Sequence, residues 1–364
     1  MRSPGDLIGL PVAELDTPAL LLDLEALERN IAKMAVRCQQ WGVGLRPHAK
    51  THKTPEVARR QLAAGAVGVT CAKLGEAEVL ADAGIDRILI STEIVGVAKV
   101  RRLLALAGRC QVLTVIDDLE AGRQLAAAAT ATGQTLDVLV DVNVGMGRTG
   151  VLAGDLAVAL ATDLSRLSGL QLVGLQGYEG NLQFLNPAVE RERRVAQAMD
   201  ALLDTALRIK ELGIELRIIS TGGTGTSRFV GQTPGVTDIQ AGSYVVMDSM
   251  YAGVEGVDFE PALSVLTSVL SRATRADAVI VDAGFKALSD DHGPAIAKDG
   301  STYEPAGDEH GRMIYAGSRP GLGDRLELIP SHCDTTINLH DVYHVIHDDQ
   351  VVAIWPIVGR GQLQ

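Results

Sequence analysis

An alternation of short apolar segments with Ala- and Leu-rich stretches runs through the first 250 residues and limits the folds open to this chain. Strands that are apolar at consecutive positions suit a parallel sheet covered on both faces. Eight such segments begin at Val43, Ala66, Arg87, Cys110, Leu136, Leu172, Leu216 and Ile239. Eight strand–helix repeats within about 200 residues predict a (β/α)8 TIM barrel. A doubly wound α/β sheet shows the same alternation, and counting strands does not establish closure.

The stretches between these strands carry helix start and stop signals. Thr54 followed by Pro55 is typical of an N-cap and the first helical position, and Gly65 is typical of a helix end. The longest helical stretch covers about 187–213. We therefore expect a helix after most strands, as a barrel of this class requires.

The segments outside this alternation predict a second structural unit. A strand-like segment at 18–24 comes first, and Asp23 resembles the N-cap of a helix that carries Ile31, Met34 and Cys38 on one face. From about Tyr251 onward, short strand-like segments follow one another, and residues 347–350 have the composition of a hairpin turn. This pattern is typical of an antiparallel β-domain.

We expect three parts in the chain. Residues 1–24 hold an N-terminal strand that joins the β-domain, residues 25–250 form the barrel, and residues 251–364 form the C-terminal antiparallel β-domain.

Composition excludes several classes of partner. The net charge is -12 and aromatic residues make up 3% of the chain, so neither the charge nor the stacking platforms of a nucleic-acid-binding protein are present. An acidic chain is also a poor match for an anionic membrane surface. The four cysteines show no paired spacing, and no signal peptide or membrane-spanning run is recognisable. We expect a cytoplasmic protein.

The segment RPHAKTHK, residues 46–53, stands where the first barrel strand should end. Catalytic groups of such barrels cluster at the carboxyl ends of the strands. On a strand, His48 and Lys50 share a face while Ala49 points the other way. We expect a desolvated Lys50 beside other cations to have a lowered pKa and to form a Schiff base. The alternative interpretation is a solvated basic loop.

Two glycine-containing turns follow the seventh and eighth strands. They are STGGTGT, residues 220–226, and QAGSY, residues 240–244. Successive backbone N–H groups in such turns can hold a phosphate, and phosphate sites after strands seven and eight recur in this class of barrel. The pair therefore predicts a phosphate site, although two ordinary tight turns would have the same composition.

His332 and Asp334 lie two residues apart in SHCDTTINLHD, residues 331–341. In extended backbone both side chains face one way and Cys333 faces the other. An imidazole and a carboxylate arranged in this way can bind a divalent metal, and the carboxylate favours Mn²⁺ or Mg²⁺ over Zn²⁺. The alternative is a hydrogen-bonded polar turn. Arg148 and Tyr178 follow the fifth and sixth strands, where a cofactor would lie.

With these residues in place, nearly the whole chain resembles the D-threonine aldolase and D-serine dehydratase family. The motifs that carry the resemblance are DTPALLLDLEALERNI, RPHAKTHK, GMGRTG, TGGTGT, QAGSYVVMD, VDAGFK, DEHG and PSHCDTTINLHD, in that order. Two segments differ from the aldolase form of the motifs. GYEGN, residues 177–181, stands where an AYHG-like form is expected, and GFKALSDDHG begins at Gly284.

The resemblance implies a fold-type III pyridoxal 5′-phosphate (PLP) enzyme, with an alanine racemase-like barrel plus a β-domain, usually a homodimer. It implies that Lys50 forms the Schiff base with the cofactor and that Arg148 meets the phenolic oxygen. Tyr178 would lie against the pyridine ring, and His332 and Asp334 would hold the metal, with His332 also among the catalytic residues. The other residues implied in cofactor binding are His48, Gly222, Gly223, Thr224, Gly242, Ser243 and Tyr244.

Within this family, H-x-D is typical of the aldolases and H-x-C of the dehydratases. His332 and Asp334 therefore favour cleavage of a D-configured β-hydroxy amino acid, such as D-threonine, to glycine and an aldehyde. The close alternative is a D-serine or D-threo-3-hydroxyaspartate dehydratase, which forms a 2-oxo acid and ammonia. A non-catalytic PLP-binding protein is the remote alternative, and the additional β-domain counts against it.

Overall fold

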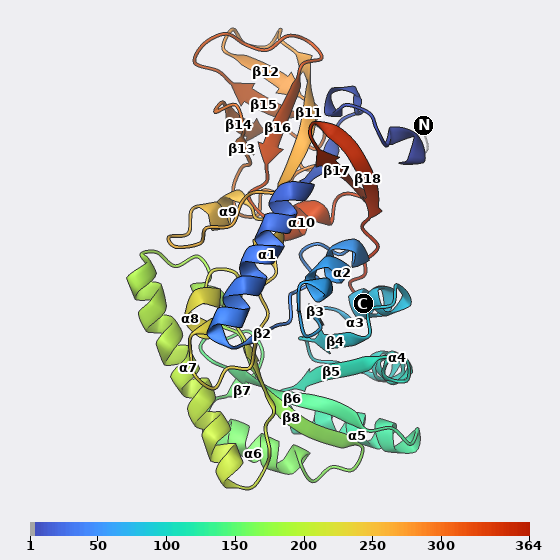
Figure 1. Cartoon of the computed structure of the whole chain (residues 1–364), viewed down its shortest axis with the longest axis vertical. Helices are drawn as coiled ribbons and strands as arrows, with labels where there is room; N and C mark the ends of the chain where they lie inside the picture. Colours follow the sequence, from blue (N-terminus) through green and yellow to red (C-terminus); the bar gives the residue numbers. More distant parts are fainter. Residues whose placement is uncertain (1–3) are drawn as a thin grey trace.

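The computed structural model describes residues 4–364 and contains two β-sheets, which lie in separate halves of the molecule (Figure 1). The three preceding residues of the predicted N-terminal part lie outside the described residues. One core of buried apolar side chains extends from Val69 and Val140 in the parallel sheet to Val265 and Tyr343 in the other sheet. The two halves are therefore packed against each other through a shared core.

The parallel sheet is a barrel with the strand order β2–β10–β9–β8–β6–β5–β4–β3. A parallel bridge between His48 and Thr70 joins the end of β2 to β3, and the amide of Ala49 donates to the carbonyl of Thr70 at 2.7 Å. The ring is thus closed, and the predicted barrel is confirmed. Its strands are β2 (Gly44–Leu45), β3 (Val69–Cys71), β4 (Arg87–Ile90), β5 (Gln111–Ile116), β6 (Leu136–Asn143), β8 (Leu170–Gly177), β9 (Ile218–Thr221) and β10 (Asp238–Ile239), with β7 (Val151–Leu152) beside β6.

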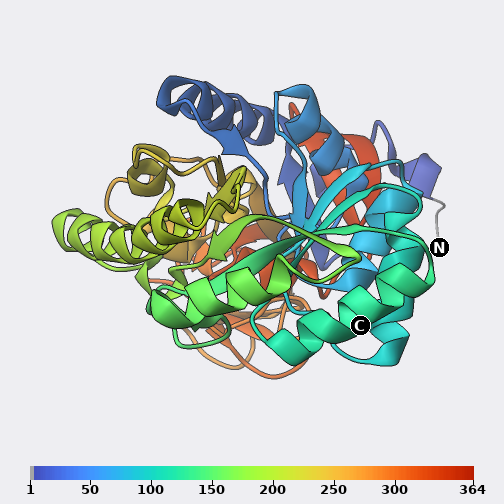
Figure 2. The same cartoon turned by 90° about the horizontal axis from the view of Figure 1, so that it is seen from below.

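Helices lie along the outer side of the barrel (Figure 2). As expected, α2 has Thr54 as its N-cap and Pro55 in its first turn, and Gly65 follows its end with a φ of +102°. The longest helix, α7, lies within the expected range. The helices of the barrel are α2 (Pro55–Ala63), α3 (Leu74–Asp82), α4 (Val97–Ala107), α5 (Leu119–Ala131), α6 (Asp155–Leu164), α7 (Ala188–Glu211) and α8 (Ser227–Gly231).

The second sheet has the order β14–β15–β12–β11–β1–β17–β18. Strand β1 lies inside this sheet, antiparallel to β11 and parallel to β17. Asp348 and Asp349, with φ of 48° and 56°, form the tight turn between β17 and β18. The strands are β1 (Ala19–Asp23), β11 (Leu263–Ser271), β12 (Ala278–Val281), β13 (Ile296–Ala297), β14 (Thr302–Pro305), β15 (Gly311–Ile314), β16 (Arg325–Ile329), β17 (Val342–His347) and β18 (Gln350–Pro356).

Three helices lie where the two halves meet (Figure 1). They are α1 (Leu24–Trp41), α9 (Ser249–Ala252) and α10 (Cys333–Ile337). The carboxylate of Asp23 accepts a hydrogen bond from the amide of Ala26 at 2.9 Å and so caps α1, while Ile31, Met34 and Cys38 are buried on one face, as predicted.

Short 3₁₀ segments complete the helical structure: η1 (Pro4–Leu7), η2 (Val12–Glu14), η3 (Gly180–Leu182) and η4 (Ser243–Val245). Within 4–364, no helix has both the length and the apolar character needed to cross a membrane.

Candidate active site

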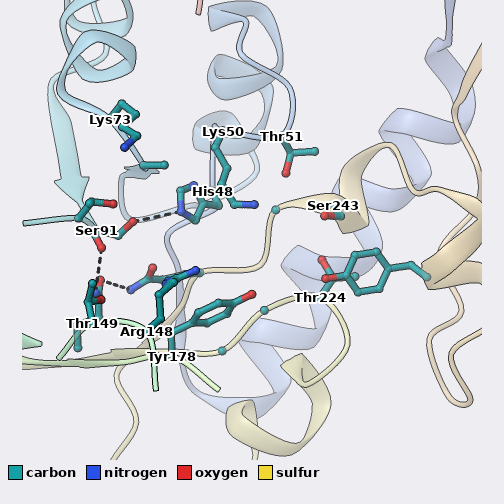
Figure 3. A pocket seen from close by; sticks show the side chains of 18 residues that line it. His48, Lys50, Thr51, Lys73, Ser91, Arg148, Thr149, Tyr178, Thr224 and Ser243 are labelled. Atoms are coloured by element: carbon teal, nitrogen blue, oxygen red, sulfur yellow. Dashed lines mark hydrogen bonds between the residues drawn. The ribbon is translucent and has the colours of Figure 1, made fainter. Parts of the chain in front are cut away.

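A cavity of about 320 Å³ opens at the carboxyl ends of the barrel strands (Figure 3). Residues from segments far apart in the sequence meet in its wall, and they include most of the predicted cofactor-binding set. The predicted residues that line it are His48, Lys50, Arg148, Tyr178, Gly222, Gly223, Thr224, Gly242 and Ser243. The strand-end rule for barrels explains why these side chains converge.

Lys50 follows the end of β2, and its ammonium is bonded to the carboxylate of Asp334 in α10. Desolvation alone would lower the pKa of Lys50, but Asp334 raises it above its ordinary value. The expected lowering of this pKa is therefore wrong. Its physical reason is that α10 brings a carboxylate, rather than further cations, to the lysine. The same contact holds the pKa of Asp334 below its ordinary value, although burial opposes this shift.

His48 and Lys50 both line the cavity, and Ala49 between them is buried. The strand expected there is wrong, because β2 ends at Leu45 and residues 49–50 form a turn. The Nε2 atom of His48 is hydrogen-bonded to the hydroxyl of Ser91 at 3.2 Å (Figure 3). Burial, reinforced by the charge of Lys50, places the pKa of His48 well below its ordinary value. The imidazole is consequently neutral at physiological pH.

The two predicted phosphate turns lie side by side at one end of the cavity. The hydroxyl of Thr224 accepts a hydrogen bond from the amide of Tyr244 at 2.9 Å, which joins the turn after β9 to the turn after β10. Gly222 has a φ of +82°, and a Cβ there would lie 2.6 Å from the side chain of Val230. Glycine is therefore required at this position by both backbone conformation and space.

Tyr244 was also predicted to bind the cofactor, but its side chain does not line the cavity. Its ring is completely buried against Phe259, at 5.4 Å between ring centroids, and its hydroxyl accepts a hydrogen bond from Gln61 at 2.9 Å. Only its backbone amide supports the cavity, through Thr224. The η4 turn directs the side chain into the core, which the sequence QAGSY alone does not reveal.

Arg148 and Tyr178 stand together in the cavity wall (Figure 3). The guanidinium lies 5.4 Å from the centroid of the Tyr178 ring, within the range of a cation–π contact. Burial raises the pKa of the Tyr178 hydroxyl, which stays protonated at physiological pH. The pair offers a cation and an aromatic face to a planar ligand.

The extended backbone expected at residues 332–334 is wrong. His332 is extended, with φ of −137° and ψ of 113°, but it is the N-cap of α10, and the two residues after it are helical. Cys333 is fully buried, and its amide donates to Asp248 at 3.0 Å. His332 and Asp334 therefore have separate partners, Asp291 and Lys50 respectively.

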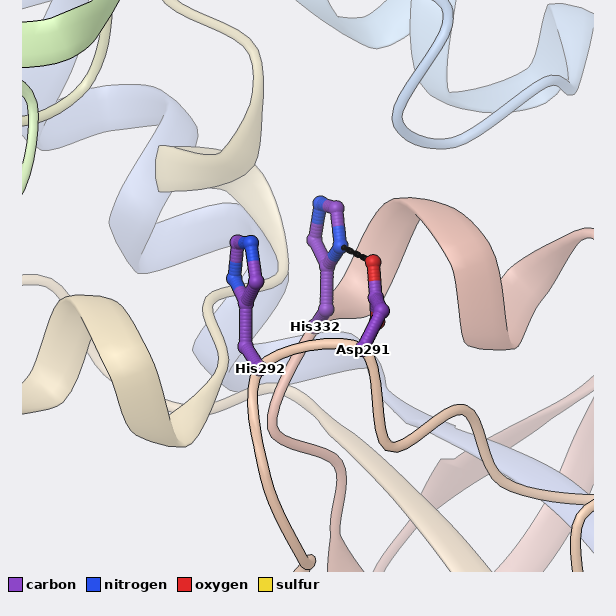
Figure 4. A group of neighbouring side chains, drawn as sticks. All are labelled: Asp291, His292 and His332. Atoms are coloured by element: carbon purple, nitrogen blue, oxygen red, sulfur yellow. Dashed lines mark hydrogen bonds and ion pairs between the residues drawn. The ribbon is translucent and has the colours of Figure 1, made fainter.

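Asp291, His292 and His332 form a cluster whose ligand atoms all lie within 4.8 Å of one another (Figure 4). The Nδ1 atom of His332 is 2.6 Å from a carboxylate oxygen of Asp291, and the two imidazole rings are stacked at 4.4 Å with an angle of 4° between them. Because a metal binds in the plane of an imidazole at about 2.1 Å, two stacked rings cannot share one ion unless one of them rotates.

Several cavity residues escaped the sequence prediction. Lys73 follows β3, Ser91 follows β4, and Gln176 lies in β8, so their positions at strand ends were the available signal. Tyr251 lies in α9, where no such signal exists. Asp291 and His292 carried a weaker signal, because the adjacent acidic and histidine residues of DDHG have the chemistry of ligands.

Comparison with known proteins agrees with this architecture. Residues 22–250 match the family model of the alanine racemase N-terminal domain, and residues 262–346 match a putative serine dehydratase domain. A D-threonine aldolase of Arthrobacter sp is 41% identical, over 98% of this chain and 95% of that protein.

Two solved structures are similar over nearly their full length. The crystal structure of D-threonine aldolase from Filomicrobium marinum has a TM-score of 0.95 and 41% identity, over 98% of this chain and 99% of that one. D-threo-3-hydroxyaspartate dehydratase from Delftia sp. HT23 has a TM-score of 0.87 and 30% identity, over 95% of this chain and 98% of that one. This chain is a member of the D-threonine aldolase and D-serine dehydratase family of alanine racemase-like proteins.

Proposed function

We propose that this protein is a PLP- and divalent-metal-dependent lyase that cleaves D-configured β-hydroxy amino acids, such as D-threonine, to glycine and an aldehyde. One observation carries the proposal. A single cavity brings together Lys50 and the glycine turn after β9, and Lys50 is ion-paired there with the carboxylate of Asp334. The 41% identity to a D-threonine aldolase over nearly the whole chain supports the same reaction.

The cavity wall suits PLP at each of its functional groups. Lys50 would hold the cofactor covalently, Arg148 would meet its phenolic oxygen, and Tyr178 would lie against its ring. Its phosphate would lie at Thr224, Gly242 and Ser243, where a Cβ on Gly242 would come within 2.7 Å of the Thr51 hydroxyl. When bound, the cofactor supplies an electron sink for the carbanion that forms at the substrate α-carbon.

The metal would lie between the barrel and the β-domain, on Asp334 and His332. Because Nδ1 of His332 bonds Asp291, its Nε2 is the nitrogen left for a ligand. Occupation of Lys50 Nζ by the cofactor would release the Asp334 carboxylate from its present ion pair. A donor set of one imidazole and one carboxylate favours Mn²⁺ or Mg²⁺, and Zn²⁺ also fits it. The metal would lower the pKa of the substrate β-hydroxyl.

The reaction then needs one proton acceptor and one proton donor. The β-hydroxyl loses its proton to a histidine, or to a water held beside it, as the bond between Cα and Cβ breaks. The electron pair stays on Cα, the aldehyde leaves, and a proton delivered to Cα completes glycine. His332 has no nitrogen free for this proton when Nδ1 bonds Asp291 and Nε2 holds the metal. Burial lowers the pKa of His48 well below its ordinary value and makes it a weak base, so the water is the better acceptor.

Dehydration is the second candidate, favoured by the similarity to the Delftia dehydratase structure. In that reaction Lys50 would remove the α-proton and the metal would assist departure of the hydroxyl group. The test is incubation of the PLP- and Mn²⁺-loaded protein with D-threonine, D-allo-threonine, D-serine and 3-hydroxy-D-aspartate. Glycine and an aldehyde would support the proposal, whereas a 2-oxo acid and ammonia would replace it with the dehydratase function.

We further propose a homodimer in the cytoplasm, on the family resemblance and the acidic composition. Lys50 and Asp334 meet within one chain, so a partner subunit is not needed to bring the barrel lysine to the metal motif. Sedimentation at assay concentration, combined with activity across a dilution series, measures whether the dimer is required.

A further inference from the structure

A fully buried carboxylate, Glu179, lies behind the turn formed by residues 221–226. It belongs to the segment GYEGN, which differs from the aldolase form of its motif. The residue follows β8 and caps η3, and its side chain has an exposed fraction of 0%. A charged group buried in this way is costly unless donors surround it.

Donors from the 221–226 turn surround this carboxylate. The hydroxyl of Thr226 donates to Oε1 at 2.5 Å, and the hydroxyl of Thr221 donates to Oε2 at 3.1 Å. The amide of Gly222 is a further donor, and the Gln183 side-chain amide donates to Oε1 at 3.3 Å. Burial raises the pKa of Glu179 in spite of these donors.

The same network fixes the backbone of the turn. The hydroxyl of Thr226 accepts from the amide of Gly223 at 3.1 Å, and Oε1 of Gln183 accepts from the amide of Gly225 at 2.9 Å. The amides of Gly222, Gly223 and Gly225 are therefore directed away from the cavity, toward Glu179 and its partners. Thr224 itself lines the cavity, and its hydroxyl joins this turn to the turn after β10.

We propose that Glu179 is a positioning residue that sets the conformation of the 221–226 turn and thereby the affinity of the site for the phosphate of PLP. It acts through Thr221, Thr226 and Gly222 and does not touch the cofactor. This inference rests on the proposed binding of PLP. Glu179 follows Tyr178 in the chain, but its side-chain hydrogen bonds go to Gln183, Thr221 and Thr226. None of them goes to Lys50, Arg148 or Tyr178, so the effect is expected at the phosphate group.

The test compares PLP with pyridoxal, which lacks the phosphate. Dissociation constants of both are measured for the apo forms of wild type, Glu179→Ala and Glu179→Gln, from visible absorbance and from borohydride-trapped label on Lys50. We expect Glu179→Ala to weaken PLP binding by about 10- to 100-fold, because two hydroxyls, the amide of Gly222 and the side-chain amide of Gln183 lose their acceptor. Pyridoxal binding should change by less than about twofold.

Asp282→Ala is the matched control. Asp282, in the β-domain, also accepts hydrogen bonds from a threonine hydroxyl and an amide, Thr267 at 2.6 Å and Ser268 at 2.9 Å. Its loss should lower thermal stability without changing the ratio of PLP to pyridoxal affinity. Thr226→Val should reproduce the effect of Glu179→Ala, and Thr226→Ser, which keeps the hydroxyl, should retain wild-type PLP affinity.

The outcomes separate the two proposals. Equal loss of PLP and pyridoxal binding in Glu179→Ala and Thr226→Val, or unchanged PLP affinity in both, overturns the role of Glu179. If Glu179→Ala does not fold, the Thr226 pair and Glu179→Gln decide the question. A wild-type protein that forms no reducible adduct with PLP overturns the proposed function itself.

Discussion

The two ends of the cavity are built in different ways. At the phosphate end, Glu179, Thr221 and Thr226 are fully buried, and the polar groups of the turn bond one another. At the metal end, the side chains of Asp291 and His332 are 40% and 20% exposed. The phosphate end is thus preformed, whereas the metal end must exchange an ion pair or rotate a ring before it binds an ion. The difference indicates that the fold would fix the position of PLP, whereas the proposed metal would reach its position only after these side chains rearrange.

Lys50 links the two ends, so its removal should have the largest effect. Lys50→Ala should abolish the covalent adduct and reduce activity by at least about 1,000-fold, because no other nucleophile replaces the Schiff-base nitrogen. Mass spectrometry after borohydride reduction measures the adduct, and Lys73→Ala, a second cavity lysine, is the control. Label found on Lys53 or Lys73 in the wild type would contradict the assignment.

Removal of the metal should reduce activity without releasing the cofactor. A chelator should reduce activity by about 100-fold or more and leave the visible absorbance of the bound cofactor, since the phosphate turns do not share ligands with the metal. Mn²⁺ should restore activity. Asp334→Ala should lose metal and activity together, as measured by metal analysis of the purified variant. Retention of stoichiometric metal in Asp334→Ala would show that the ion lies elsewhere.

A methyl group at Gly222 should disturb the preformed end. Gly222→Ala places a Cβ 2.6 Å from Val230 and 2.8 Å from Ile239 at a φ of +82°. Strain and overpacking together should lower the free energy of unfolding by about 2–4 kcal/mol. Gly84→Ala is the control, because Gly84 has a φ of +88° but open space around the Cβ. Its loss in the free energy of unfolding, about 1 kcal/mol, measures the backbone strain without the crowding. Equal losses in denaturant melts of the two variants would argue against crowding at the turn.

Cys333→Ala should produce the smallest effect, although it lies between His332 and Asp334. Cys333 is fully buried, and its thiol donates a weak hydrogen bond to Oδ1 of Asp334 at 3.5 Å, so its replacement should cost about 1 kcal/mol of stability through a small cavity and the loss of this bond. Metal content and activity should remain within about twofold of wild type. Loss of the metal from this variant would instead identify the thiol as a ligand and favour the dehydratase function.

The sequence was enough to predict the cavity residues that lie at strand ends. It was not enough to predict contacts between segments that are far apart in the chain. Lys50, Arg148 and the two glycine turns could be placed in one cavity because every barrel strand delivers its carboxyl end to the same face. The contact of Lys50 with Asp334 could not be predicted, since it joins two domains through the packing of α10. Glu179 was visible only as a difference in a motif, because hydrogen bonds with Thr221 and Thr226 require the folded turn.

Strand β1 has a consequence for how the protein is made. It precedes the whole barrel in the sequence, yet its neighbours β11 and β17 both follow the barrel. Leu20 and Leu22, which are fully buried in the folded protein, therefore lack their β11 partners while the barrel sequence is being made. The nascent chain therefore carries an unpaired apolar strand, open to chaperone binding, until β11 follows the barrel.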